Sequence, residues 1–266
     1  MQAEKKSILD EIVEHKTLEV EAQKKNVPFE TFILNIGRST RDFRKAILRP
    51  GKEDAIRLIA ELKFASPASG KIRDASKDEI VRITKLYNKY ASAISVLTDE
   101  KYFGGSVLNL KDAARISSVP ILRKDFIVDK YQIVESRYYG ADAILLIASV
   151  LGEQKLKSFM GAAKGLGMAC LVEVHDKGDL DVAIRAGADI IGINNRDLKT
   201  MDVDVKNTLE LSGQIPDNVV VVSESGIRTK EDVERLREAN VDAVLVGTAI
   251  MEGDVEDKLK ELIGDV

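Results

Sequence analysis

Gly140-Ala141-Asp142-Ala143-Ile144-Leu145-Leu146-Ile147 decides the fold, because it joins the end of one predicted helix directly to a buried strand. The glycine suits a left-handed helix cap, and the five apolar residues at its end form a continuous strand. The arrangement recurs at Gly187-Ala188-Asp189 and, in altered form, at Asn240-Val241-Asp242, each time before an apolar run. This weak internal repeat favours a series of strand and helix units over two separate domains.

Short β-rich runs alternate with longer segments of helical periodicity along the chain. The eight predicted strands cover residues 58–61, 93–97, 120–122, 143–147, 169–172, 190–193, 219–222 and 243–246. Helical spacing with charged faces is found at residues 77–91, 129–139, 153–166, 177–186 and 229–239. Apolar strands between amphipathic helices imply a parallel sheet covered by helices. Eight such units match the size of a closed (β/α)8 TIM barrel, an α/β fold, which we predict here.

The first fifty residues depart from this repeat. Apolar residues between Ile8 and Val13 follow helical spacing after a candidate Ser7 cap, and the polar remainder up to Asn26 predicts a long surface helix. We expect residues 1–50 to be an amino-terminal helical extension packed against a barrel opening, in preference to a partner-binding module. Residues 1–266 are then one barrel domain with its extension.

Composition limits the classes of function. The chain has 266 residues, of which 44% are hydrophobic and 32% charged, enough apolar material for a sizeable core. The formal net charge of −4 provides no basic field for nucleic acid or an anionic membrane, so we expect neither as a partner. Any anionic ligand must be held by local groups.

The sequence also predicts a location. Cys170 is the only cysteine, so no intrachain disulfide can form and a reducing cytosol is the expected setting. The first seven residues lead into an amphipathic segment instead of the apolar core of a signal peptide. The longest apolar stretch, residues 143–151, is shorter than the roughly 20 residues of a membrane span. We therefore expect a cytoplasmic protein.

The carboxyl ends of barrel strands, with the loops after them, form the active site of such folds. Polar residues follow most of the predicted strands there, namely Glu61, Lys63, Ser66, Lys124, Glu173, Asn194, Arg196, Glu224, Ser225, Gly226, Gly247 and Thr248. Glu61 and Lys63 are one residue apart, so both side chains point to the same side of a strand. For that pair alone, a salt bridge that fills the barrel remains an open alternative. Several lysines and glutamates at one rim together favour a functional site.

Lys124 ends a short apolar strand abruptly with charge. Burying an ammonium group is unfavourable without a partner, so either a salt bridge with Asp125 or Glu173 or a catalytic task would account for it. Arg196, in the run at residues 194–198, carries a guanidinium fork suited to a carboxylate or phosphate, although turn chemistry would also explain the asparagines around it.

The last two strands end in small residues. Ser223-Glu224-Ser225-Gly226-Ile227 and Val246-Gly247-Thr248-Ala249-Ile250 place hydroxyls and glycines where barrels bind phosphate through backbone amides. Glycine permits an anion to approach the backbone closely, so we predict a phosphate site at these two turns.

Other familiar chemistries are absent from the sequence. The run at residues 165–170 begins like a dinucleotide fingerprint, but Cys170 stands at its sixth position and a strand follows it. His15 and His175 are too few for a histidine-rich metal site, and His175 is expected to start a helix or lie at the surface. We expect no metal and no cofactor.

Six motifs together resemble a known family. They are Glu61-Leu62-Lys63-Phe64-Ala65-Ser66-Pro67, Ser95 to Ser106, Leu122-Arg123-Lys124-Asp125-Phe126, Leu171-Val172-Glu173-Val174-His175, Gly192 to Leu198, and Ser223-Glu224-Ser225-Gly226-Ile227. In this order, and with the helical extension before them, they resemble indole-3-glycerol phosphate synthase.

The resemblance implies closure of 1-(2-carboxyphenylamino)-1-deoxyribulose 5-phosphate to indole-3-glycerol phosphate, a step of tryptophan biosynthesis that releases carbon dioxide and water. By that resemblance Lys124 is the general acid, and Lys63 holds the anthranilate carboxylate. The remaining roles it implies are proton exchange or positioning by Glu61, Glu173 and Asn194, polar and phosphate contacts by Ser66, Arg196, Glu224, Ser225, Gly226, Gly247 and Thr248, and an aromatic wall of Phe103 and Phe126. A second cation nearby lowers the pKa of a lysine, and a lysine with a lowered pKa can donate its proton near neutral pH.

The first loop departs from the family pattern. Phe64 stands where the family implies a second basic residue, and Ala68-Ser69-Gly70 replaces a Ser-Lys-Gly ending. We expect the contacts of this loop, and with them substrate affinity, to differ from those of a typical member.

Three alternatives remain open. Another phosphosugar barrel, such as the isomerase that precedes this step in the pathway, would favour an acid and base pair over a double lysine. A Schiff-base aldolase would use Lys63 or Lys124 as nucleophile. A catalytically silent phosphometabolite-binding protein would bind without turnover. We expect a monomer with a phosphorylated small-molecule substrate and other tryptophan-pathway enzymes as potential partners.

Overall fold

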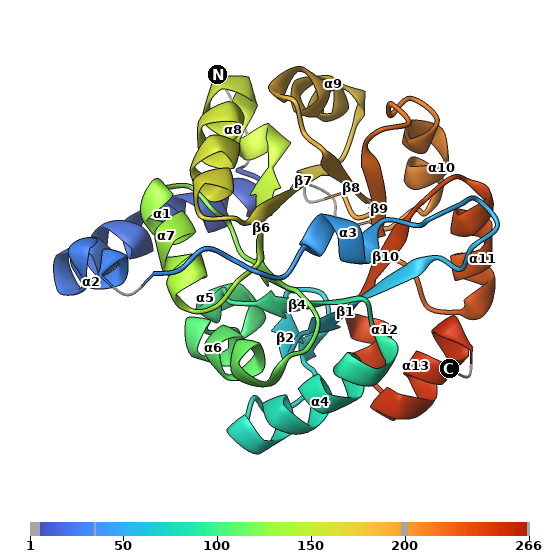
Figure 1. Ribbon diagram of the computed structural model, residues 1–266, viewed down its shortest axis with the longest axis horizontal. Helices are drawn as coiled ribbons and strands as arrows, with labels where there is room; N and C mark the ends of the chain where they lie inside the picture. The colour runs from blue at the N-terminus through green and yellow to red at the C-terminus, as the bar shows by residue number, and fades with distance from the viewer. Residues whose placement is uncertain (1–5, 35, 198–201, 265–266) are drawn as a thin grey trace.

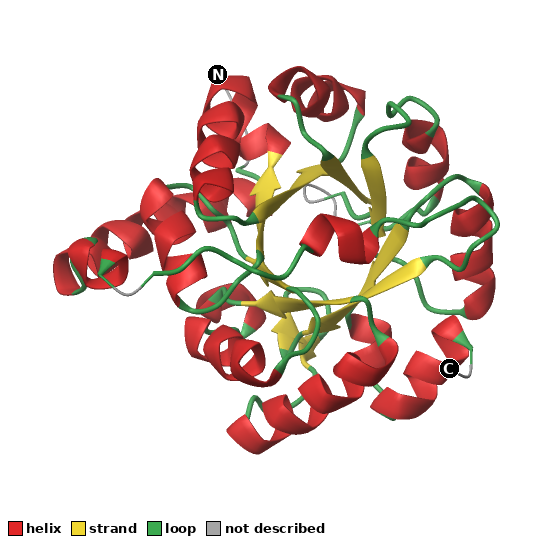
Figure 2. Cartoon of the chain, in the orientation of Figure 1, coloured by secondary structure: helices red, strands yellow, loops and turns green. Residues whose placement is uncertain are grey.

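A closed barrel of eight parallel strands forms the centre of the computed structural model, which describes residues 6–34, 36–197 and 202–264. The strands are β1 (Arg57–Leu62), β4 (Ala93–Leu97), β5 (Ile121–Lys124), β6 (Ala143–Ile147), β7 (Ala169–Val174), β8 (Ile190–Asn194), β9 (Val220–Glu224) and β10 (Ala243–Val246). They follow one another around the barrel in chain order, and β1 pairs with both β4 and β10. Figure 2 shows the strands as a ring inside the helices. The predicted TIM barrel is confirmed.

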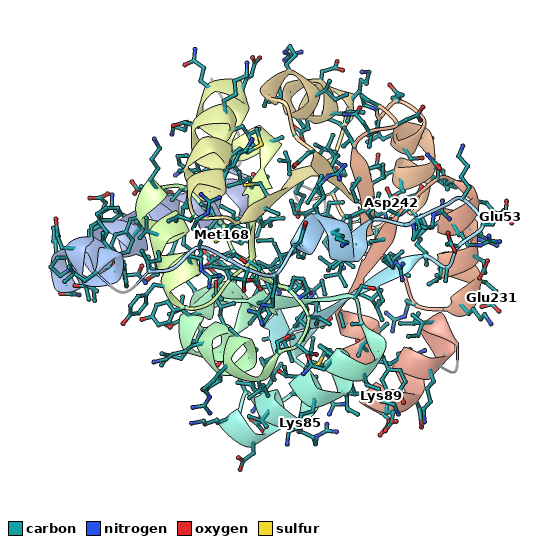
Figure 3. The ribbon with its side chains drawn as sticks, in the orientation of Figure 1. Glu53, Lys85, Lys89, Met168, Glu231 and Asp242 are labelled. Carbon is teal, nitrogen blue, oxygen red and sulfur yellow. The ribbon has the colours of Figure 1, made fainter. Side chains whose placement is uncertain are left out.

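Helices cover the outside of the ring (Figure 1). They are α4 (Lys77–Tyr90), α6 (Val107–Ile116), α7 (Lys130–Tyr138), α8 (Ala148–Gly165), α9 (Lys177–Ala186), α10 (Lys206–Ser212), α11 (Lys230–Glu238) and α13 (Val255–Ile263), with the short α5 (Glu100–Phe103) and α12 (Thr248–Met251) in two of the connections. Lys85, Lys89 and Glu231 illustrate the charged outer faces, pointing away from the barrel (Figure 3). Across the three described stretches, no helix has the length and apolar character required to cross a membrane.

The repeated caps adopt the backbone conformation that the sequence predicts. The φ angle is 98° at Gly140, 83° at Gly187 and 61° at Asn240, which is left-handed at all three positions. The aspartate of the first repeat, Asp142, accepts a hydrogen bond from the backbone N–H of Ile121 at 2.9 Å. The cap therefore turns the chain into the next strand, and its aspartate fixes the start of the strand beside it.

Five strands, β1, β5, β7, β8 and β9, run further than predicted at their carboxyl ends, and this places functional side chains within the barrel wall. Lys124, Asn194 and Glu224 are the last residues of β5, β8 and β9. Helix α8 also begins earlier than predicted, at Ala148, and is interrupted at Gly152, where φ is 65°. The ends of these strands were not predicted, because a search for apolar runs stops at the first polar side chain.

Helix α3 (Phe43–Ile47) lies across the opening at the amino ends of the strands, at the centre of the view in Figure 1. Phe43 and Ile47 are fully buried there against inward-facing residues such as Ile59, Ala93 and Ala143. Burying these two side chains contributes roughly 1.5–3 kcal/mol each. A helix of this length has too few residues to show a period, so the sequence did not predict it separately.

Helix α1 (Ile8–Asn26) has the bounds that the sequence predicts, with Ser7 forming a capping box with Asp10. The sequence predicted that the rest of this helix, up to Asn26, lies at the surface. That prediction is partly wrong, because Lys16 and Val20 are buried. Val20 packs with Phe32 of the short α2 (Glu30–Ile33) against α7.

Candidate active site

The carboxyl ends of the strands open into a pocket of about 390 Å³. It is lined by every predicted site residue except Ser66, namely Glu61, Lys63, Phe103, Lys124, Phe126, Glu173, Asn194, Arg196, Glu224, Ser225, Gly226, Gly247 and Thr248. These residues come from strands and loops far apart in the sequence, and the closed barrel is what brings them to one rim.

Lys124 lies between two carboxylates. Its Nζ is 3.2 Å from Oε2 of Glu173 and 3.2 Å from Oε2 of Glu224, and its side chain is only 15% exposed. Asp125, the other partner considered from the sequence, pairs instead with Lys16 and Arg123. The charge at the end of β5 is thus compensated within the pocket by carboxylates from β7 and β9.

The electrostatics of the two lysines reverse the expectation from the sequence. Burial by itself lowers the pKa of Lys124, but the carboxylates of Glu173, Glu224 and Glu61 outweigh burial and raise that pKa above its ordinary value. A lowered pKa belongs to Lys63, where burial outweighs the opposing Glu61 carboxylate and the Lys124 ammonium adds to the shift. The expectation of a Lys124 with a lowered pKa is therefore wrong.

Glu224 also has a shifted pKa. Burial raises its pKa to about 7, with the neighbouring Glu173 carboxylate adding to the shift and Lys124 opposing it. Its carboxylate occupies the space above Gly192 of β8, where an added Cβ would collide with Oε1. Gly192 is therefore required for this close approach, a role that the sequence analysis did not assign to it.

Glu61 is held by groups from three elements. Its Oε1 lies 3.8 Å from Lys63 Nζ, Ser95 donates to its Oε2 at 3.3 Å, and Tyr87 donates to its backbone carbonyl at 3.1 Å. A Cβ on Gly247 would collide with Oε1. Glu61 and Lys63 thus form a long ion pair, and both side chains line the pocket at the carboxyl ends of the strands.

Asn194 links the carboxylate side of the pocket to the loop after β8. Its amide donates to Oε1 of Glu173 at 3.1 Å, and its Oδ1 accepts from the backbone N–H of Arg196 at 3.0 Å. Nδ1 of His175 lies 3.1 Å from the Asn194 carbonyl, so His175 supports this loop although it is partly exposed. Leu198, the last residue of the predicted motif, lies outside the described residues.

The two turns predicted as a phosphate site lie side by side, because β9 and β10 are paired neighbours. Ser225 and Gly226 are both left-handed, with φ of 70° and 80°. A Cβ on Gly226 would lie 2.6 Å from Cγ1 of Val203, so glycine is needed there for space as well as for conformation. Gly247 and Thr248 begin α12 on the same side of the pocket.

Ser66 belongs to a smaller side pocket of about 50 Å³ between α1 and the loop after β1. This pocket shares Lys63 and Arg196 with the main one, and Phe103 and Phe126 stand between the two with ring centroids 6.1 Å apart. Ser66 is in β2 (Ala65–Ser66), which pairs with β3 (Gly70–Lys71), and its Oγ accepts from the N–H of Ser69. Ser66 therefore lines the side pocket that adjoins the main one.

The residues that depart from the family pattern occupy this same loop. Phe64 is buried in the core, and Ser69 lines the main pocket. The apolar part of the lining was not predicted from the sequence, and it consists of Leu97, Leu145, Ile147, Val203, Ile227, Leu245, Val246 and Ala249. The period of two along β6 and β10 was the available signal for Leu145, Ile147 and Leu245.

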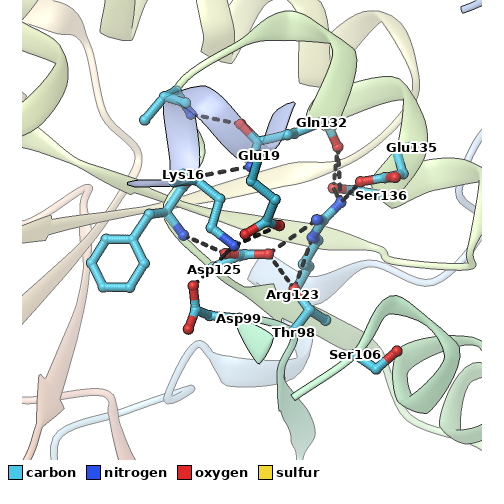
Figure 4. A network of polar contacts seen from close by, with 12 residues as sticks. Lys16, Glu19, Thr98, Asp99, Ser106, Arg123, Asp125, Gln132, Glu135 and Ser136 are labelled. Carbon is cyan, nitrogen blue, oxygen red and sulfur yellow. Dashed lines mark hydrogen bonds and ion pairs between the residues drawn. The ribbon is translucent and has the colours of Figure 1, made fainter. Parts of the chain in front are cut away.

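A buried charge network joins Lys16, Asp99, Arg123 and Asp125 (Figure 4). Nη2 of Arg123 is 3.0 Å from Oδ2 of Asp125, and Nζ of Lys16 is 3.2 Å from Oδ1 of Asp125 and 2.9 Å from Oδ2 of Asp99. Arg123 and Asp125 flank Lys124 in the sequence, so the network fixes the backbone on both sides of it. Lys16 joins α1 to this end of the barrel.

Comparison with known proteins identifies the family. The sequence matches the family described as indole-3-glycerol phosphate synthase over residues 9–262. The chain belongs to the indole-3-glycerol phosphate synthase family. An indole-3-glycerol phosphate synthase from Thermoanaerobacter sp. (strain X514) is 47% identical over 259 residues, covering 96% of this chain and 97% of that protein. One from Caldanaerobacter subterraneus subsp. tengcongensis is 45% identical, covering 97% and 98%.

Solved structures show a more distant likeness in the barrel. A mutant tryptophan synthase alpha-subunit from Pyrococcus furiosus superposes with a TM-score of 0.61 at 18% identity, covering 79% of this chain and 98% of that chain. A chain of the tryptophan synthase a2b2 complex from the same organism has a TM-score of 0.60. This likeness shows the fold alone, whereas the sequence match confirms the resemblance to the indole-3-glycerol phosphate synthase family.

Proposed function

We propose that this chain is a carboxy-lyase of tryptophan biosynthesis that closes 1-(2-carboxyphenylamino)-1-deoxyribulose 5-phosphate to indole-3-glycerol phosphate. Its family supports this reaction. The observation that carries it in the structure is the placement of Lys124 between Glu173 and Glu224, in one pocket with Lys63 and Glu61. That arrangement supplies a charged acid, a second cation and several carboxylates around one substrate.

In the first step the ring carbon that bears the carboxylate attacks the ketone carbon of the sugar chain, and the ketone oxygen becomes an alkoxide. An alkoxide is a strong base, so a lysine that is held charged by Glu173 and Glu224 both stabilises and protonates it. The raised pKa of Lys124 therefore serves this step by keeping the proton on Nζ until the alkoxide forms.

Two bonds then break. Loss of carbon dioxide sends its electron pair to the ring iminium, which restores the aromatic ring. Loss of water then needs an acid for the departing hydroxyl and a base for the neighbouring methylene proton. Lys63 and the carboxylates of Glu61 and Glu173 supply both types of group in the pocket, and Asn194 holds Glu173 in place. One carbon dioxide and one water leave for each ring closed.

The rest of the pocket suits the rest of the substrate. Its apolar wall and the rings of Phe103 and Phe126 match an anthranilate ring, and Lys63 and Arg196 match its carboxylate. The left-handed turn at Ser225 and Gly226 lies beside the start of α12, a combination that suits a phosphate.

The ion pairs also argue against Lys124 as the nucleophile of a Schiff-base aldolase. A Schiff base needs a neutral amine, and the carboxylates around Lys124 keep it charged. Burial lowers the pKa of Lys63, so Lys63 is the lysine that an aldolase would use. Because the proposed reaction forms no Schiff base, borohydride with substrate should fix no adduct on Lys63 or Lys124, and an adduct at either residue would support the aldolase.

The proposal is tested with Lys124→Ala, assayed against wild type and against Lys85→Ala, which removes an exposed lysine on α4. We expect formation of indoleglycerol phosphate to disappear in Lys124→Ala and to stay at the wild-type rate in Lys85→Ala, with the same circular dichroism spectrum for all three. Wild-type turnover in Lys124→Ala would show that the acid role is assigned to the wrong residue.

We further propose that residues 1–266 act as one catalytic unit, a monomer in the cytoplasm. The buried, unpaired thiol of Cys170 suits a reducing compartment. Light scattering across a concentration series tests the monomer, and the same experiment with other tryptophan-pathway enzymes tests for association.

A further inference from the structure

The turn at Ser225 is strained. A left-handed conformation is unusual for a residue with a Cβ, and Ser225 has φ of 70° immediately before Gly226 at 80°. Such a conformation persists only where the surrounding structure enforces it. The backbone carbonyl of Ser225 is bonded to the side chain of Asn195, which is 2% exposed.

The Asn195 amide has a bond for each of its donors. Its Nδ2 donates to the backbone carbonyl of Ser225 at 3.0 Å and to Oγ of Ser223 at 3.1 Å. Its Oδ1 accepts from the backbone N–H of Thr208 at 3.1 Å and from its Oγ1 at 2.8 Å. An amide with two donors and two accepted bonds is fully satisfied, so its orientation is fixed.

The backbone of Asn195 is also tied to both loops. Its N–H donates to the carbonyl of Glu224 at 2.9 Å, and its own carbonyl accepts from the N–H of Asp204 at 2.9 Å. Asn195 follows Asn194 and precedes Arg196, which both line the pocket, while Asn195 does not. Its side chain points behind the pocket wall, where it connects the loop after β8 to the turn after β9.

We propose that Asn195 is a positioning residue for the phosphate group of the substrate. It holds the Ser225 carbonyl so that the turn at Ser225 and Gly226 keeps its left-handed shape, and it couples that turn to the loop that carries Arg196. This inference rests on the proposed function, because the turn is assigned there to the phosphate.

Thr208 provides a matched control for a purely structural role. Its hydroxyl lies 2.8 Å from both Asn195 Oδ1 and Ser223 Oγ and is fully buried in the same network. Thr208→Val removes that hydroxyl with little change of shape, but leaves the bond from Asn195 to the Ser225 carbonyl in place. Both variants should lose stability, and only loss of Asn195 should release the turn.

The experiment compares wild type, Asn195→Ala and Thr208→Val, with inorganic phosphate as the probe. We expect Asn195→Ala to raise the KM of the phosphorylated substrate and the inhibition constant of phosphate about tenfold, which corresponds to about 1.4 kcal/mol. We expect kcat to stay within about twofold, since the groups around Lys124 are not touched. Thr208→Val should leave both constants within about twofold of wild type.

The phosphate constant decides the outcome. An unchanged phosphate constant in Asn195→Ala, or an equal rise in Thr208→Val, would overturn the proposal, because the network would then act on stability alone. If Asn195→Ala does not fold, Asn195→Ser removes the same two donors and is measured in its place. Calorimetry measures phosphate binding to the wild-type protein without any turnover, so this measurement is independent of whether the proposed reaction takes place. An absence of phosphate binding would contradict this inference.

Discussion

Replacing Lys16 by methionine removes one ammonium group from the interior and little else. Its Nζ lies 2.9 Å from Asp99 Oδ2, 3.2 Å from Asp125 Oδ1 and 3.0 Å from Glu19 Oε1, and the side chain is 1% exposed. Burial lowers the pKa of Lys16, but Asp125 and Asp99 outweigh it and raise that pKa, so the group is charged at neutral pH. Methionine has a similar length and an apolar end.

The expected loss follows from what is left behind. Asp99 and Asp125 have carboxylates that are 0% and 1% exposed, so without Lys16 two buried negative charges lose a shared cation. Breaking a buried ion pair by removing one partner costs about 3–5 kcal/mol. That is a large part of the ~5–15 kcal/mol by which a domain is usually stable.

Denaturation by urea at neutral pH measures this loss, with Lys24→Met as the matched control on the same helix. Lys24 pairs with Glu21 and Asp129 at 2.8 and 2.7 Å, but its side chain is 31% exposed, so its removal should cost at most about 1 kcal/mol. Equal midpoints for the Lys16 and Lys24 variants would refute the reasoning, because the buried network would then contribute no more than a surface pair.

Three further changes test other parts of the structure. Gly192→Ala should displace the Glu224 carboxylate and lower kcat/KM at least tenfold, whereas Gly161→Ala, in open space within α8, should leave steady-state rates unchanged. The pKa of Glu224 is raised from 4.5 to about 7. The contribution of the Glu224 carboxyl group to the unfolding free energy is therefore fully present below pH 4.5 and is lost as the pH rises through 7. The unfolding free energy of Glu224→Gln should therefore rise relative to wild type across that window, by on the order of 3 kcal/mol, and a constant difference would contradict the burial argument. Tyr87→Phe removes the hydroxyl bonded to the Glu61 carbonyl and should lower the unfolding free energy by about 1 kcal/mol, checked by urea titration; an unchanged midpoint would argue against that bond.

The barrel could be predicted from the sequence because its signals are local. Apolar runs such as residues 143–147 and the caps at Gly140, Gly187 and Asn240 depend on propensity and backbone conformation within a few residues. The position of the candidate site could be predicted from the barrel, because a parallel barrel brings the carboxyl ends of all its strands to one rim, whatever their spacing along the chain. This is why nearly all the predicted site residues share one pocket.

What could not be predicted depends on contacts between distant segments. Lys16 looks like a surface residue on a polar helix, and only the positions of Asp99 and Asp125 make it a buried cation. Asn195 is indistinguishable in sequence from Asn194, yet the two side chains lie on opposite sides of the pocket wall. The direction of the pKa shift of Lys124 also depends on distant segments. Its pKa was expected to fall, but it is raised, because the sequence does not show how close Glu173 and Glu224 lie.

Indole fluorescence, followed as the purified protein meets 1-(2-carboxyphenylamino)-1-deoxyribulose 5-phosphate, tests the central claim most directly. The proposed reaction predicts an increase in fluorescence with one carbon dioxide released for each indole formed, without added metal or cofactor. Tight binding of the substrate with neither fluorescence nor carbon dioxide would contradict it, and would make the pocket around Lys124 a binding site without catalysis.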